Sequence, residues 1–272
     1  MRPLLLVLLT LFPFTNCFTQ DTKTTSKDKG TIYFNWGWNR SAYTRSNIHF
    51  AGAYYDFTLK DVKATDRPSP FGLDPYFHPL KLTIPQVNYG MGYFLKEQES
   101  IYLGVDHMKY VVTQGQKVKI DGQINGTPYD GTYNDTEIEI SDKLLLLEHT
   151  DGLNYIHFGY AHHGKKYYLN PSIFGSLMGG GAAGLIYPRT NATFLGNERY
   201  DEFNLAGYGI TGKIALRISF WNKFFIQATT KAGFINMPNI RTTQFVDDKA
   251  SQHFFFLQSN LLFGGLIKLN KP

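Results

Sequence analysis

The stretch FNLAGYGITGKIALRISFWNKFFIQATTKAGFIN, residues 203–236, decides the fold. It contains two runs in which apolar and polar residues alternate, separated by a tight turn at Trp221 and Asn222. Successive side chains of a strand point to opposite sides, so this period of two predicts a β-hairpin. The polar side of the hairpin carries these longer side chains well inside the strands: Lys213, Arg217, Gln227 and Lys231.

Two architectures fit such a hairpin, and alternation alone does not distinguish them. A soluble β-sandwich would bury the apolar side and show the cations to water. A membrane barrel would turn the apolar side to lipid and enclose the cations in its lumen. The choice therefore depends on the rest of the chain.

The composition suits one large all-β domain or two small ones. The chain has 272 residues, of which 16% are aromatic and 18% are charged. Tyr and Phe favour strands and also the interfacial belts of membrane proteins. The net charge of +5 is not concentrated in a cluster of Lys and Arg. The sequence therefore does not indicate nucleic-acid binding.

The N-terminus predicts export. Arg2 precedes an apolar run at residues 4–12 that is too short to cross a bilayer as a helix, which is typical of a secretory signal peptide. We predict a signal peptide at residues 1–19, a flexible arm at 20–29 and one barrel domain at 30–272. Cys17, the only cysteine, lies in this leader, so the mature chain would have neither a disulfide nor a cysteine-ligated metal.

Long loops alternate with tight turns along the chain, as in outer-membrane barrels with turns in the periplasm and loops outside. The long loops are expected at residues 61–85, 115–142, 188–202 and 237–251, and the turns at 96–100, 163–166 and 221–222. The sequence therefore predicts an all-β fold, an antiparallel up-and-down transmembrane β-barrel with eight strands.

The strand count depends on a few segments. Residues 101–112 and 167–187 are each expected to be one strand, and residues 144–163 one long strand with a bulge. Residues 48–59 are assigned to the first outer loop, and residues 115–142 to a β-extended loop. Ten strands are the alternative, if residues 144–163 split at their Asp-Gly hairpin dipeptide and residues 48–59 cross the membrane.

The cations of the hairpin need a partner if they lie in a lumen, because an unpaired buried charge is very costly. Asp106 would point inward if Ile101, Leu103 and Val105 face lipid. We therefore expect Asp106 to pair with one of the cations. The predicted lumen network, which would hold the barrel shut, comprises Asp106, Lys213, Arg217, Gln227 and Lys231.

The outward side is expected to carry an aromatic belt at the lipid interface. Its predicted members are Trp36, Trp38, Tyr89, Tyr93, Tyr208 and Phe220. His107 and Lys109 would also face outward, near the outer interface, where they could contact the phosphates of lipopolysaccharide.

No pattern indicates a cofactor or metal. Gly179, Gly181 and Gly184 have the spacing of a dinucleotide-binding loop, but no helix follows them. These glycines are better explained as positions where a strand bends or needs room. His162 and His163 are adjacent, so on a strand they face opposite sides and cannot converge on a metal.

One group of residues is weighed as a catalytic site. His149 lies near Glu148 and Ser141 at the loop end, where an enzyme acting on lipid A would have its site. Because such residue types occur together by chance in a chain of this length, we predict no catalytic residue.

Four stretches carry a resemblance to outer-membrane β-barrels of the small OmpA/OmpX kind and, more narrowly, to uncharacterised barrels of Bacteroidota. They are FNWGWNR (Phe34–Arg40), GVDHMKYV (Gly104–Val111), HTDGLNY (His149–Tyr155) and INMPNIRTT (Ile235–Thr243). The chain departs from the pattern at its end, where many such barrels finish on an aromatic residue and this one ends in Lys-Pro. The resemblance implies a fold and a location but no reaction.

We therefore expect a protein of a Gram-negative outer membrane with a structural or surface-binding role and no catalysis. Its expected partners are outer-membrane lipid, lipopolysaccharide and the barrel-assembly machinery, with no nucleic acid and no cofactor. A narrow porin-like channel and a lipid-A-modifying enzyme are the alternatives. The sequence does not identify an external ligand.

Overall fold

The structure, a computed structural model, describes residues 28–70, 72–76, 78, 85–149, 151–197 and 199–269. The predicted signal peptide at 1–19, residues 20–27 of the predicted arm and the last three residues lie outside these ranges. The division of the chain into signal peptide, arm and barrel stays a prediction.

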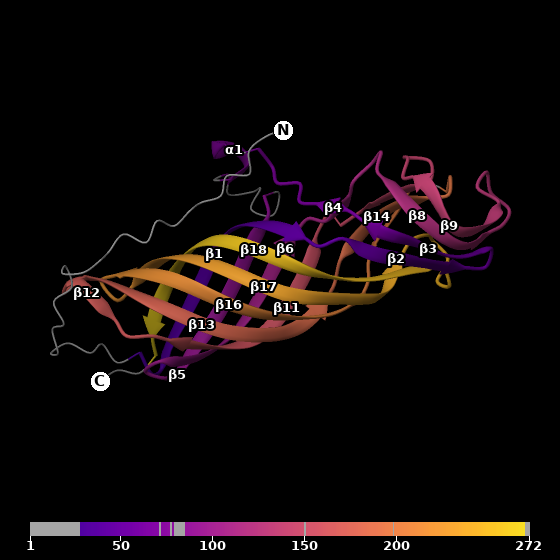
Figure 1. The fold of residues 1–272 in the computed structure, drawn as a ribbon. Coiled ribbons are helices and arrows are strands. Elements are labelled where there is room, and N and C mark those ends of the chain that lie inside the picture. The colour runs from indigo at the N-terminus through magenta and orange to yellow at the C-terminus, as the bar shows by residue number, and fades with distance from the viewer. Residues whose placement is uncertain are drawn as a thin grey trace.

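Across the described ranges, eight antiparallel strands close into a barrel (Figure 1). Their order around the barrel is β1 (Thr31–Tyr43), β5 (Val87–Lys96), β6 (Glu99–Met108), β11 (Leu153–His163), β13 (Ile173–Ile186), β16 (Gly207–Phe220), β17 (Phe224–Arg241) and β18 (Lys249–Lys268). β18 pairs back with β1, from Thr31 opposite Lys268 to Tyr43 opposite Phe256. The prediction of an up-and-down barrel with eight strands is confirmed.

The hairpin that decides the fold has the predicted turn. Trp221 and Asn222 both have φ of 53°. Two consecutive residues in this left-handed region match the turn whose twist suits an antiparallel hairpin. The turn joins β16 to β17 with Phe220 opposite Phe224.

A second region, the outer cap, grows from one end of the barrel. Beyond Tyr43 the chain passes Thr44 and Arg45 and then continues along β18 as β2 (Ser46–Gly52). β3 (Tyr55–Val62), β8 (Lys117–Ile124) and β9 (Gly131–Glu139) extend this sheet outward. The second sheet of the cap consists of β15 (Tyr200–Phe203), β14 (Arg189–Phe194), β10 (Leu145–Glu148), β7 (Val111–Val112) and β4 (Ala64–Thr65).

The two sheets of the outer cap enclose an apolar core. Phe194 of β14 stacks on Phe50 of β2 with ring centroids 4.7 Å apart, and on Phe57 of β3 at 6.0 Å. Tyr55 meets the edge of the Phe194 ring at 5.0 Å. This core is continuous with the apolar side chains at the outer mouth of the barrel, such as Phe254. The cap therefore packs as a β-sandwich resting on the barrel.

Two smaller elements lie beside the barrel. β12 (Tyr167–Asn170) forms a short hairpin with β13 at the end opposite the outer cap (Figure 1). α1 (Leu73–Tyr76) lies beside the outer half of the barrel, with the Tyr76 ring 5.6 Å from that of Trp38. Within the described residues, none of the helices is long and apolar enough to cross a membrane.

Several segment boundaries differ from the prediction. Residues 101–112 are not one strand, because β6 ends at Met108 and β7 joins the other sheet. Residues 144–163 split into β10 of the cap and β11 of the barrel, and residues 167–187 contain β12, a turn and β13. The segments 188–202 and 237–251, predicted as loops, contribute strands as well. Except for β12, which pairs with β13 at the opposite end, these segments gain backbone partners at the cap end, which local alternation does not reveal.

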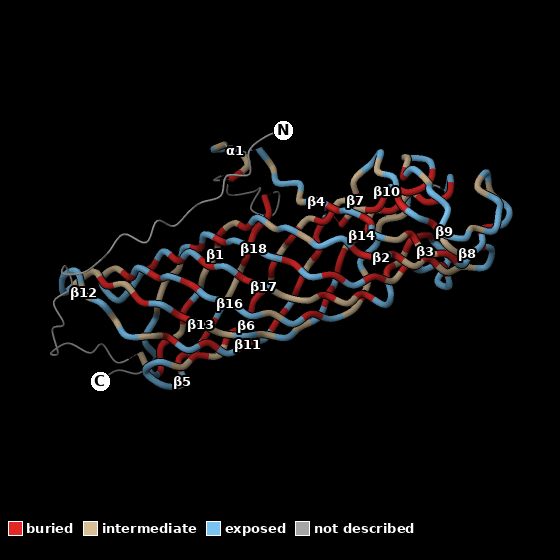
Figure 2. Tube along the Cα trace, viewed as in Figure 1, coloured by how far each residue is buried: buried red, intermediate tan, exposed pale blue. Residues whose placement is uncertain are grey.

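Buried and exposed residues alternate along β17 and β18 (Figure 2), and the residues on the buried side change from polar to apolar toward the cap. Between Phe224 and Phe234 the buried positions include Gln227, Thr229 and Lys231, whereas beyond Phe234 they are Ile235, Met237 and Ile240. Ten strand steps of about 3.3 Å at a tilt of about 40° rise about 25 Å, the height of the apolar band of an outer-membrane barrel. The exposed apolar band is therefore the lipid-facing surface, and the protein is located in the outer membrane of a Gram-negative cell.

Candidate functional site

The candidate site is a polar layer inside the barrel. It forms because inward positions of five strands carry polar residues at one level: Asn39 on β1, Asn88 on β5, Asp106 on β6, Lys231 on β17 and Gln258 on β18. All five residues are buried. Because the outside of the barrel faces hydrocarbon, these polar groups lie in the lumen.

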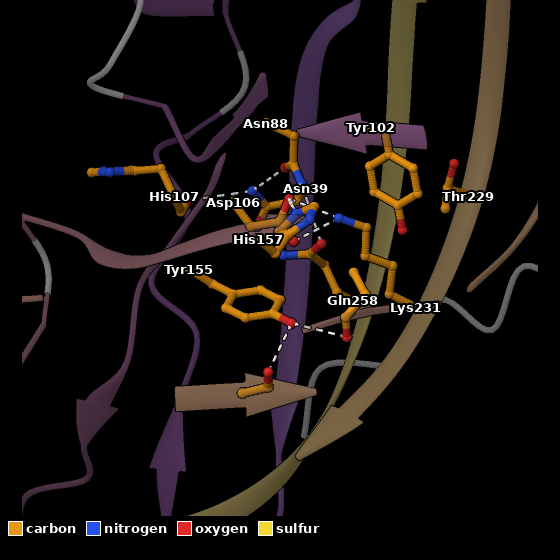
Figure 3. Close-up of polar contacts among 12 residues, drawn as sticks. Asn39, Asn88, Tyr102, Asp106, His107, Tyr155, His157, Thr229, Lys231 and Gln258 are labelled. Atoms are coloured by element: carbon orange, nitrogen blue, oxygen red, sulfur yellow. Dashed lines mark hydrogen bonds and ion pairs between the residues drawn. The ribbon is translucent and has the colours of Figure 1, made fainter. Parts of the chain in front are cut away.

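Asp106 is at the centre of the layer (Figure 3). Lys231 Nζ donates to both carboxylate oxygens, at 2.7 Å to Oδ1 and 2.6 Å to Oδ2. Asn88 Nδ2 donates to Asp106 Oδ1, and His157 Nε2 lies 3.4 Å from the same oxygen. Of the three cations that the sequence offered as partners for Asp106, the structure selects Lys231.

Amides extend the layer around the ion pair. Asn39 Nδ2 donates to Asn88 Oδ1 at 2.6 Å, and Gln86 Nε2 donates to Asn39 Oδ1 at 3.2 Å. Asn88 Nδ2 also lies 3.3 Å from Gln258 Oε1. A buried charge is tolerated when its remaining lone pairs are satisfied in this way. Together, the ion pair and these amides cross-link β1, β5, β6, β17 and β18 across the lumen.

Arg217 and Gln227 form a second contact, one that does not include Asp106. Arg217 Nε donates to Gln227 Oε1 at 2.9 Å, and Gln227 Nε2 donates to Thr229 Oγ1 at 2.8 Å. The Arg217 guanidinium also lies over the Phe225 ring, with Cζ 3.9 Å from its centroid, and 5.1 Å from the Tyr33 centroid. The predicted lumen residues thus divide into an ion-paired group and an arginine held by an amide and two rings.

Lys213 is placed differently from the other cations. Its Nζ lies 3.4 Å from the centroid of the Tyr102 ring. Directly across the hairpin it faces Lys231, another cation, on the same side of the sheet. Both lysines line a small cavity of about 30 Å³, together with Arg217, Asp106 and Asn35.

Apolar side chains pack across the lumen on both sides of the polar layer. Toward the turn end, a cluster includes Tyr33, Phe94 and Phe225. Toward the cap, Met108, Tyr155 and other residues at the barrel mouth belong to the large apolar core. The interior is therefore filled by layers of side chains, as expected for eight strands.

The six predicted belt residues all lie on outward positions of β1, β5 and β16. Tyr93 and Phe220 lie close to the turn end, and Trp38 and Tyr208 lie toward the cap end. Trp36 faces Tyr89 across β1 and β5. Trp38 is covered in part by Tyr76, so the first outer loop folds down beside it.

The outer interface carries cations and polar groups beside these aromatics. Arg40 Nη2 donates to the Tyr76 hydroxyl at 2.6 Å. His107 points away from the lumen cluster and pairs through Nδ1 with Asn154 Oδ1 at 2.8 Å (Figure 3). Burial lowers the pKa of Lys109, which lies nearby.

The histidines are dispersed through the barrel and the cap, and His163 Nε2 lies 2.9 Å from Ser100 Oγ. His162 is exposed and His163 buried, as alternation requires. His149 lies in the cap core, where it shares a hydrogen bond with Thr190 and where burial lowers its pKa to about 3. Ser141 instead contacts the Tyr129 hydroxyl, 3.4 Å from its Oγ. In the part of the chain that the structure describes, no three His, Cys, Asp or Glu side chains gather as a metal site would require.

Sequence reasoning did not assign several members of the polar layer. Asn39, Asn88, His157 and Gln258 were not predicted as lumen residues, although each is a polar residue at an inward position of its strand. The inward position of these polar residues in the alternation was the sequence signal that could have identified them. It identifies the face of each residue, but the partner across the lumen depends on the stagger of the strands.

Comparisons with known proteins found no match among protein-family models and none among curated proteins. Solved structures of outer-membrane proteins are similar in outline. OprG from Pseudomonas aeruginosa gives a TM-score of 0.42 at 10% identity, covering 89% of this chain and 98% of that one. Neisserial surface protein A gives a TM-score of 0.33 at 9% identity, covering 89% of this chain and 100% of that one. The Ail protein of Yersinia pestis gives a TM-score of 0.26 at 9% identity, covering 86% of this chain and 99% of that one.

These TM-scores all lie below 0.5, so the fold rests on the strand ladder and the apolar band described above. The resemblance to Bacteroidota barrels stays a prediction, because none of these structures bears on it.

Proposed function

We propose that this protein is a non-enzymatic outer-membrane protein whose closed barrel anchors a rigid cap outside the cell for contact with an external partner. One observation carries the proposal. The lumen is packed with side chains above and below a buried ion pair, whereas the outer segments form two sheets around a core of their own. The chain thus builds an ordered surface body on a filled barrel.

The end of the cap farthest from the barrel offers a contact surface. Tyr54, Phe245 and Val246 are 70%, 61% and 73% exposed. Tyr54 lies in the connection after β2, and Phe245 and Val246 lie in the connection before β18. These two connections are adjacent, because Ala51 of β2 pairs with Lys249 of β18. We call these three residues the distal tip. Exposed apolar side chains grouped in this way are typical of protein contact sites.

The outer interface supports the proposed contact with lipopolysaccharide. Arg40, His107 and Lys109 lie on or beside the outward face near the aromatic belt. Cations in this position are suited to lipid phosphates. Insertion would depend on the barrel-assembly machinery, as for other chains of this fold.

Single cysteines test the orientation, because the predicted mature chain has none. Tyr54→Cys places a thiol on the distal tip, and Leu169→Cys places one on exposed β12 at the opposite end. On intact cells, a membrane-impermeant maleimide should label the first and not the second, while both should react after lysis. Labelling of Leu169→Cys alone on intact cells would invert the proposed topology.

Cross-linking tests the contact itself. A photo-reactive amino acid replacing Phe245 should form adducts on whole cells. The same amino acid replacing Thr136, which is exposed on β9 of the cap, is the control. Equal adduct formation at the two positions would argue against a specific role of the distal tip.

The two rival functions have direct tests. A channel would give conductance steps in planar bilayers, and a packed lumen should give none. An enzyme acting on lipid A would alter the lipid-A mass spectrum of cells that express the protein, and we expect no change.

A further inference from the structure

The lumen cavity has an excess of positive charge. Among the described residues that line it, Lys213, Arg217 and Lys231 oppose one carboxylate, that of Asp106. With His157 neutral, three cations and one anion leave two positive charges around a cavity of about 30 Å³. Unbalanced charge away from bulk water is costly, so the excess calls for an explanation.

Lys213 is the cation that the protein does not neutralise. Asp106 is engaged by Lys231 at 2.6 Å. The only close partner of the Lys213 ammonium within the described chain is the Tyr102 ring, at 3.4 Å from Nζ to the centroid. A ring face attracts a cation but carries no net charge. Like charges directly opposite on a sheet repel, and Lys213 directly faces Lys231.

Arg217 brings further hydrogen-bond donors to the lining of the cavity. Arg217, which is 4% exposed, uses Nε for Gln227. Among the described residues, Asp28 interacts with Arg217 electrostatically, but no carboxylate forms a direct ion pair with it. The Lys213 ammonium and the remaining guanidinium nitrogens of Arg217 are donors of the cavity lining that match an acceptor with negative charge.

We propose that the cavity holds a small inorganic anion, of the size and charge of chloride, bound between Lys213 and Arg217. The anion accepts from the Lys213 ammonium and the guanidinium, and it offsets the repulsion between Lys213 and Lys231. It serves as a structural counter-ion inside the filled barrel. This site is independent of the distal tip and of the proposed contact outside the cell.

Bromide tests the site directly, because it replaces chloride and scatters anomalously. Crystals of the mature protein grown in bromide should show an anomalous peak in contact with Lys213 Nζ. Crystals of Lys213→Met should lack it. Absence of the peak in the wild-type protein would overturn the proposal, since Lys213 would then be accommodated without an anion.

A solution test uses the temperature at which half of the protein loses its compact migration on a gel. In chloride this midpoint should lie about 3 °C above that in gluconate at equal ionic strength. Lys213→Met should lose the difference. Lys117→Met, on the exposed face of the cap, should keep it. An equal chloride effect in Lys213→Met would contradict the assignment, and if that variant fails to fold, the wild-type bromide map still decides.

Discussion

In the barrel, apolar side chains such as Ile214 and Leu257 face outward and are exposed, while Gln227 and Lys231 are buried inside. In the outer cap the apolar side chains such as Phe50 and Phe194 are buried, and charged residues face outward. Both regions have the same alternation along each strand. The difference teaches that the surrounding medium, lipid or water, decides which face is enclosed.

β18 contains both arrangements in one continuous strand. Asn260 and Gln258 point into the barrel, whereas Phe254 and Ala250 of the same inward parity lie in apolar surroundings next to the cap. On the opposite parity, Phe255 and Leu257 face lipid, and Lys249 faces water. The change on the outward side, from apolar residues to Lys249, marks the outer boundary of the membrane.

The largest expected loss of folding free energy distinguishes the buried ion pair of the lumen from an exposed ion pair of the cap. Asp106→Asn leaves the Lys231 ammonium unpaired in the lumen, which should cost about 3–5 kcal/mol of folding free energy. Lys117→Met breaks the exposed Lys117–Glu137 pair of the cap, 2.9 Å long, and should cost less than about 1 kcal/mol. Urea titrations of folding into lipid vesicles measure both. Similar losses in the two variants would mean that the lumen is well hydrated.

The next prediction compares the outward faces of the two regions. Ala228→Arg places a cation near the middle of the lipid-facing run of β17 and should cost about 2–4 kcal/mol. Thr136→Arg makes the same change at an exposed position of β9 and should cost about 0.5 kcal/mol or less. The same vesicle titrations report both values. Tolerance of Ala228→Arg would place that face in water and make the barrel assignment wrong.

The smallest expected effect concerns the cap core alone. Burial lowers the pKa of His149 to about 3, so between this value and the unfolded pKa of about 6.5 the unfolded cap binds more protons. Cap stability should therefore fall as pH drops, by roughly 2 kcal/mol from pH 7 to pH 5.

Proteolysis of the cap at the two pH values measures this change, with the gel mobility of the barrel as an internal reference. His149→Gln should remove most of the pH dependence. If His149→Gln kept the full pH dependence of cap stability, that dependence would come from other titratable groups.

The period-two pattern and the order of long loops and short turns were sufficient to predict the closed eight-stranded barrel. They also predicted which side of β16 and β17 is polar. They could not predict that residues 144–163 divide between two sheets, because Leu145 and Leu147 alternate in the same way as membrane strands do. The pairing of β10 with β14 involves residues more than forty positions apart, and local patterns do not encode it.

For the candidate site, the sequence identified the ionisable side chains and their faces, because parity along a strand is a local property. Which cation meets Asp106 was decided by the stagger of strands around the closed barrel, which brings Lys231 to the carboxylate and leaves Lys213 against the Tyr102 ring. The medium on each side of the sheets was decided only when the barrel closed and the cap sheets packed. Closure and packing depend on contacts between distant strands, and these exist only in the folded chain.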